Sequence, residues 1–151
     1  MTQFYTPSMV NEERLDTLLK LVVRSISKEV DARLANCGLS DAQAIPILLI
    51  AGGRCQTATQ IAGVIDVDGG AVSRMVGRLE SRGILVKDRS TGDRREVRVR
   101  LSDVGLDWAH RISCVLSDVA NDHLAGFATQ EHQALMTLLK RLRANGRLIG
   151  W

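Results

Sequence analysis

The chain has 151 residues, 45% hydrophobic and 25% charged, which predicts one domain or two closely packed lobes and excludes intrinsic disorder. Aromatic residues make up 3%, too few for a platform that stacks single-stranded bases or RNA. No apolar run approaches the roughly 20 residues that span a bilayer, and residues 1–10 lack a secretory pattern. Three widely spaced cysteines fit neither a disulfide framework nor a zinc ribbon. We therefore expect a cytoplasmic protein without a membrane partner, metal or cofactor.

The positive charge is concentrated in one part of the chain. The net charge is +3, from 20 basic and 17 acidic residues. Residues 74–100 contain nine basic and four acidic side chains, a local charge of +5, which leaves −2 for the remainder. A basic surface on a mildly acidic body predicts a polyanionic partner.

Two helices are expected in the first third of the chain. Residues 11–35 repeat apolar side chains every three or four positions, which predicts a long amphipathic helix that ends at the following glycine. Residues 40–51 predict a second helix, with Ser40 as N-cap and Gln43 at the capping-box position. Pro46 lies inside this helix and is expected to kink it or to lie near its first turns.

Two shorter helices and a hairpin should follow. The helices are expected over residues 57–64 and from residue 69 to the glycine at 83. Apolar and charged residues then alternate around Ile84 and Val86 and again over residues 97–101, which predicts two strands around a charged loop. Ser102 should cap a helix that runs to Leu124, and Thr129 should cap a last one through Leu142.

This order of elements predicts a mainly α fold with a small β-hairpin. A short helix pair with a tight turn, followed directly by a charged hairpin, is typical of a winged helix-turn-helix. We therefore expect a DNA-binding lobe over residues 40–101. Residues 11–37 and 102–145 should form a helical dimerisation region, because they carry more apolar surface than one small lobe can bury.

Candidate DNA-binding residues lie on the polar side of the fourth predicted helix. Small residues at its start let the backbone approach a groove wall, and N–H groups there can bind phosphate. Ser73 and Arg74 can reach base edges, and arginine suits guanine. Arg78 and Arg82 continue the same basic stripe. The predicted contacts on this helix are Gly69, Gly70, Ala71, Ser73, Arg74 and Arg78.

The tip of the hairpin supplies the other candidate contacts. Arg94 and Arg95 can enter a narrow minor groove, where negative potential is focused. Asp93 should hold one of these arginines or a loop amide and keep the tip ordered.

These segments resemble the MarR family of bacterial transcriptional regulators. The resemblance lies in Thr57-Ala-Thr-Gln-Ile-Ala, Asp68-Gly-Gly-Ala-Val-Ser-Arg-Met-Val-Gly-Arg-Leu-Glu-Ser-Arg-Gly-Ile-Leu, Gly92-Asp-Arg-Arg and Val97-Arg-Val-Arg-Leu-Ser-Asp-Val-Gly. The family's wing signature, Asp-x-Arg and then a strand ending Leu-Thr, is met by Asp93, Arg95 and Leu101-Ser102. The similarity covers roughly residues 11–145 and departs at Gly77, where members of this type often carry a polar residue.

The resemblance implies a homodimer whose first, fifth and sixth helices intertwine and whose two lobes bind a pseudo-palindromic operator in double-stranded DNA. It implies a repressor that a small aromatic or acidic effector releases from DNA. Such an effector would bind between the dimerisation helices and the DNA lobe. The candidate lining residues are Arg24, Trp108, His110 and Arg111.

Alternatives stay open at this point. A metal-sensing regulator of the same fold would use His110 and Cys114, which share a helix face but are too few for a metal site. A redox-sensing regulator would use Cys55, because it precedes a helix N-terminus whose dipole favours a thiolate. A dimeric adaptor without DNA binding is a third alternative. The chain has no GxSxG, Walker, HExxH or CxxC motif, so we do not expect an enzyme.

Overall fold

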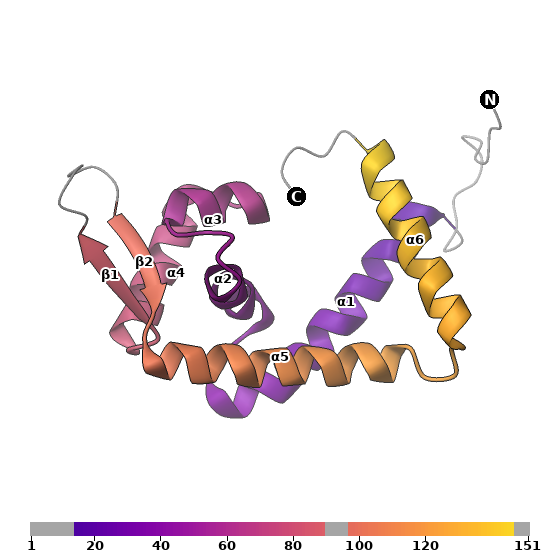
Figure 1. Cartoon of the computed structure of the whole chain (residues 1–151), viewed down its shortest axis with the longest axis horizontal. Coiled ribbons are helices and arrows are strands. Elements are labelled where there is room, and N and C mark those ends of the chain that lie inside the picture. Colours follow the sequence, from indigo (N-terminus) through magenta and orange to yellow (C-terminus); the bar gives the residue numbers. More distant parts are fainter. Residues whose placement is uncertain (1–13, 90–96, 147–151) are drawn as a thin grey trace.

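The computed structural model describes residues 14–89 and 97–146 and shows a mainly helical chain with a two-strand hairpin (Figure 1). Its elements are α1 (Leu15–Leu34), η1 (Ala35–Cys37), α2 (Asp41–Ala51), α3 (Ala58–Ile65), α4 (Gly69–Ser81), β1 (Leu85–Arg89), β2 (Val97–Leu101), α5 (Asp103–His123) and α6 (Thr129–Asn145). This order confirms the predicted fold class. The predicted helix start at residues 11–13 lies outside the described residues.

The long helix α5 connects the two parts of the molecule. In Figure 1 it runs from the lobe of α2, α3, α4 and the hairpin to the end that carries α6. No single helix in the described ranges is long and apolar enough to cross a membrane. In the same ranges, α1 with η1 taken together with α2 meets that test by length and composition, and this pair is bent by 85°.

The turn between α1 and α2 contains the caps that the sequence predicts. Gly38 adopts a left-handed conformation with φ of 64°, and its N–H donates to the Ala35 carbonyl at 2.9 Å. Ser40 donates its backbone N–H to Oε1 of Gln43 at 3.1 Å, which confirms the capping-box position. Pro46 is the sixth residue of α2, which places it in the second turn, near the start as predicted, and it is buried.

Side chains of α1 hold this turn and α5 in place. The Asp41 carboxylate accepts from Oγ of Ser27 at 2.7 Å, and the Asp41 N–H donates to Oδ1 of Asp31 at 2.7 Å. Further along α1, the Arg33 guanidinium pairs with Asp122 of α5. The second half of α1 is therefore tied to both α2 and α5.

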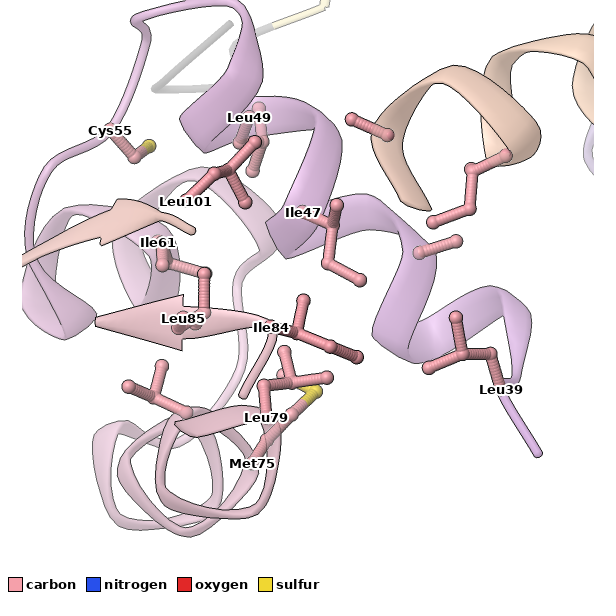
Figure 2. Packing of buried hydrophobic residues seen from close by; sticks show 14 of the residues in the cluster. Leu39, Ile47, Leu49, Cys55, Ile61, Met75, Leu79, Ile84, Leu85 and Leu101 are labelled. Atoms are coloured by element: carbon pink, nitrogen blue, oxygen red, sulfur yellow. The ribbon is translucent and has the colours of Figure 1, made fainter. Parts of the chain in front are cut away.

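The core of the lobe lies between α2, α3, α4 and the hairpin (Figure 2). Four residues of α4 face it, as the spacing predicts: Val72, Met75, Val76 and Leu79. The hairpin departs from the expected alternation, because β1 begins at Leu85 and pairs that residue with Leu101. Ile84 lies in the bend before β1, and it is buried together with Leu85. Val86 is only half-buried.

The start of α5 is fastened to the bend before β1. Ser102 caps α5 as predicted, since its Oγ accepts from the Gly105 N–H at 2.9 Å. The Ser102 N–H donates to the Ile84 carbonyl at 3.1 Å, and its hydroxyl contacts the Gly83 carbonyl. A Cβ built on Gly105 would lie 2.1 Å from the Ile84 carbonyl oxygen. Only glycine at this position permits the observed approach of helix and hairpin.

Cys55 lies in this core, which makes its prediction as a redox thiol wrong. It is 1% exposed and lies beside Leu49 and Leu101 in the core (Figure 2). Burial raises the pKa of the Cys55 thiol, because a thiolate is poorly solvated there. The helix dipole that motivated the prediction does not outweigh this desolvation. Cys55 therefore has neither the exposure nor the lowered pKa of a sensor cysteine.

Replacing Gly105 with alanine should destabilise the fold. The added methyl group meets backbone that cannot move aside, so we expect the free energy of unfolding to fall by about 1–3 kcal/mol. Urea denaturation followed by circular dichroism measures this. Gly77→Ala is the matched control, because nothing lies within 4 Å of its Cβ position and helix propensity alone should add roughly 1 kcal/mol. Equal stability of Gly105→Ala and the parent protein would contradict the packing argument.

Thiol labelling should separate Cys55 from Cys114, which is exposed in the chain. At pH 7, iodoacetamide should alkylate Cys55 far more slowly, since the thiolate is the reacting species. Because its pKa is raised, its labelling should accelerate only above the ordinary thiol value of about 8.5. Mass spectrometry of timed samples gives both rates, and denaturant should make them alike. Faster labelling of Cys55 in the folded protein would overturn the assignment.

Candidate nucleic-acid interface

The turn between α3 and α4 is built from local side-chain caps. Thr57 caps α3 by accepting from the Gln60 N–H at 3.2 Å. The chain reverses at Asp66, which adopts a left-handed conformation with φ of 52°, a conformation that aspartate tolerates better than most residues. Asp68 then caps α4, since its Oδ2 accepts from the Ala71 N–H at 2.9 Å. The two helices thus form a helix-turn-helix whose second helix is α4.

Helix α4 has a buried face and an exposed face. Its apolar side packs on α3 and the hairpin (Figure 2), and the opposite side carries the residues predicted to contact DNA. The exposed residues are Gly69, Gly70, Ser73, Arg74 and Arg78, and Ala71 is half-buried. The structure therefore places all six predicted residues of this helix on its outward side or at its start. Their contact with DNA stays a prediction.

The start of α4 differs from the expectation of open N–H groups. The Ala71 N–H is already bonded to Asp68, and the cap places a carboxylate where a phosphate was expected. A Cβ on Gly70 would lie 3.0 Å from Oδ2 of Asp68 and 3.5 Å from Nη1 of Arg74. The Arg74 guanidinium therefore extends back over Gly70 toward the N-cap. Glycine at position 70 leaves room for this arrangement.

Arg82 does not belong to the basic stripe that the sequence spacing indicated. Its Nη1 donates to the Gly38 carbonyl at 2.7 Å, and its Nη2 donates to the Cys37 carbonyl at 2.9 Å. The guanidinium therefore points to the turn between α1 and α2. Helical periodicity places Arg82 on a line with Arg74 and Arg78 but says nothing about that turn.

The hairpin adds basic side chains that were not among the DNA-binding residues predicted from the sequence. Arg98 and Arg100 on β2 are both exposed, and Lys87 of β1 pairs with Glu80 of α4. A third extended segment borders β2, because the Val99 N–H donates to the Gln56 carbonyl at 2.7 Å. The alternation of basic and apolar residues in β2 is the signal that could have identified both arginines. The tip residues Asp93, Arg94 and Arg95 lie outside the described residues.

A cleft lies where α2, the extended segment before α3, the hairpin and α5 meet. Its lining is partly apolar and includes two arginines and one aspartate. The lining residues are Ile50, Ala51, Gly53, Cys55, Gln56, Asp88, Arg98, Val99, Arg100, Leu101 and Leu106. Sequence reasoning missed this cleft because separate elements contribute to it.

The predicted effector-binding residues do not line this cleft. Arg111 lies over the Trp108 ring, with 5.5 Å between the guanidinium carbon and the ring centroid. Nε2 of His110 lies 3.9 Å from Sγ of Cys114, and both residues are exposed, as is Arg24. Within residues 14–89 and 97–146, no group of three or more His, Cys, Asp or Glu side chains could hold a metal ion. The effector role of the four residues stays a prediction.

The chain is similar in sequence to bacterial transcriptional regulators. The MarR family matches residues 48–97, which hold α3, α4 and β1 and end at the first residue of β2. A protein of Thauera aromatica assigned to transcriptional regulation of the hcr operon is 32% identical over 90 residues. That match covers 60% of this chain and 53% of the relative, so it spans only about half of the relative's length.

Solved structures match over nearly the whole length. The transcriptional regulator PA3341 has a TM-score of 0.77 and 29% identity, covering 87% of this chain and 97% of that one. A cysteine-to-serine mutant of MarR from E. coli complexed with operator DNA has a TM-score of 0.75 and 25% identity, covering 85% and 92%. These likenesses are to transcriptional regulators, which confirms the prediction of a non-enzymatic protein. The chain belongs to the MarR family of winged helix-turn-helix transcriptional regulators.

Proposed function

We propose that this chain is a homodimeric transcriptional repressor that binds a pseudo-palindromic operator in double-stranded DNA and that a small effector releases. The observation that carries the proposal is the two-sided helix α4. Its apolar face is fully used by the lobe, so the exposed face with Arg74 and Arg78 is left for a partner. A helix held in this way by a hairpin is suited to the major groove.

Charge and the relatives support DNA as that partner. Arg98 and Arg100 extend the basic surface from α4 onto β2, and the +5 charge of residues 74–100 favours a polyanion. The MarR mutant described above forms a complex with operator DNA. The wing arginines Arg94 and Arg95 are expected, from the sequence, to contact phosphates or the minor groove.

The uncovered apolar surface supports a homodimer. Within the described part of the chain, α6 buries none of its side chains, and the first half of α1 is largely exposed. A groove between the two helices is lined by Leu15, Leu135, Leu138, Leu139, Arg141, Leu142 and Asn145. Exposed apolar surface of this extent is typical of an interface. A second copy related by two-fold symmetry would cover it and would place two α4 helices on one duplex.

Repression and release by an effector follow from the resemblance to the family. A small aromatic or acidic molecule would bind near Arg24, Trp108, His110 and Arg111, between the dimerisation helices and the DNA lobe. Its binding would change the distance or angle between the two lobes and so lower operator affinity.

Replacing Arg74 with alanine should weaken binding to the operator more than to random DNA. If Arg74 hydrogen-bonds a guanine edge, the loss should be about 1–3 kcal/mol on the operator and much smaller elsewhere. The operator duplex is first selected from a random pool with the parent protein. Fluorescence anisotropy then measures the affinity of the variant and of the parent for this duplex and for a random one. Equal losses of affinity for both duplexes would make Arg74 a phosphate contact. If the parent protein bound no duplex at all, the alternative of a dimeric adaptor without DNA binding would be favoured.

A charge on the exposed face of α6 should break the dimer. Leu138 is 52% exposed in the single chain, and Leu138→Glu would place a carboxylate in the proposed interface. Sedimentation equilibrium should show a dissociation constant at least about tenfold higher than that of the parent. Gln133→Glu is the control, since it adds the same charge roughly 140° away around the helix. An unchanged dimer in Leu138→Glu would exclude this face as the interface.

A further inference from the structure

Arg82 joins the end of helix α4 to the end of helix α1. The residue follows Ser81, the last residue of α4, and its guanidinium donates to the carbonyls of Gly38 and Cys37 at 2.7 and 2.9 Å. Those carbonyls belong to the last residue of η1 and to the glycine that caps it. The contact therefore crosses from the proposed DNA-reading helix to the turn that directly follows the helix of the proposed dimer interface.

The turn that accepts these hydrogen bonds is itself fixed. Gly38 is held in a left-handed conformation by its hydrogen bond to Ala35, and the Leu39 N–H donates to the Leu34 carbonyl at 3.4 Å. Leu39 is buried in the core. The start of α2 is bonded back to α1 through Asp41, as described above. Arg82 is thus attached to a rigid point and not to a loose loop.

The main packing partners of α4 lie within its own lobe. Its apolar face contacts α3 and β1, which move with it if the lobe tilts. The Arg82 contact is different, because it reaches η1 and Gly38, which directly follow α1. A planar guanidinium with two donors on two adjacent carbonyls fixes an orientation, whereas a lysine ammonium acts as a single point of contact.

We propose that Arg82 is a positioning residue that sets the orientation of α4 relative to the dimerisation helices and thereby the operator spacing that the dimer accepts. The inference rests on the proposed function. In a two-fold dimer, half-sites lie about 34–36 Å apart, so a fixed α4 orientation selects one separation. One extra central base pair moves the half-sites apart by about 3.4 Å and rotates them by roughly 35°.

The test compares Arg82→Lys and Arg82→Gln with Arg78→Lys and Arg78→Gln. Binding is measured at several salt concentrations to a duplex selected from a random pool by the parent protein, and to the same duplex with one central base pair inserted. Thermal denaturation verifies that each variant is folded. Arg78 is the matched control, because it lies one helical turn earlier on α4 and is exposed.

Both Arg82 variants should bind the selected duplex roughly three- to thirtyfold more weakly. Their preference for it over the lengthened duplex should fall at least about threefold, because α4 is no longer held at one angle. The slope of log affinity against log salt should not change, since no phosphate contact is lost. Arg78→Lys should keep the spacing preference of the parent, and Arg78→Gln should keep it even if its salt slope changes.

Three results would overturn the inference. A salt slope reduced by about one in Arg82→Gln would make Arg82 a phosphate ligand. Parent-like binding by Arg82→Lys would show that charge is sufficient and that the two-carbonyl contact is not needed. Weaker binding with an unchanged spacing preference would leave only a structural role. If the parent protein bound no duplex, the proposed function itself would fail, a result distinct from these three.

Discussion

The close approach of helix α5 to the Ile84 carbonyl is the constraint on which the rest of the arrangement depends. Gly105 permits the approach, because it has no side chain. Ser102 caps α5 through its hydroxyl oxygen and also donates its backbone N–H to the Ile84 carbonyl in the bend before β1. The hairpin, the end of α4 and the start of α5 therefore meet at one point. The start of α5 is therefore joined to this bend both by the Ser102 N–H, which donates to the Ile84 carbonyl, and by the Ser102 hydroxyl on the Gly83 carbonyl.

Because α5 spans the molecule, this junction connects the lobe to the distant helix α6 (Figure 1). Arg33 ties α1 to the far half of α5, and Arg82 ties α4 to the end of α1. The lobe is thus fixed to the dimerisation region through α5, through the turn after α1 and through the bonds of Asp41 in α2 to Ser27 and Asp31 of α1. Several separate attachments define an orientation, whereas one would leave a hinge. This explains how a protein of this size can present α4 at a defined angle.

The lobe and the dimerisation region differ in how completely they bury their apolar side chains. The lobe encloses most of its apolar side chains in a contiguous core, and the face of α4 that carries Arg74 and Arg78 lies outside it. The helices α1 and α6 leave leucines of their facing sides in contact with solvent. The lobe buries its apolar side chains without a partner, whereas the dimerisation region does not. A second copy that covers the exposed leucines of α1 and α6 explains this difference, which agrees with the proposed homodimer.

Local features of the fold were predictable from the amino-acid pattern by itself. Helical spacing identified the buried face of α4, and the serine caps of α2 and α5 lay where predicted, because such signals involve residues only a few positions apart. The family followed from motifs of the same local kind. Only the tertiary structure decided the roles of Arg82 and Cys55. Each of these depends on which segments meet in space, and a hydrogen-bond partner or burial there outweighs the charge pattern along the chain.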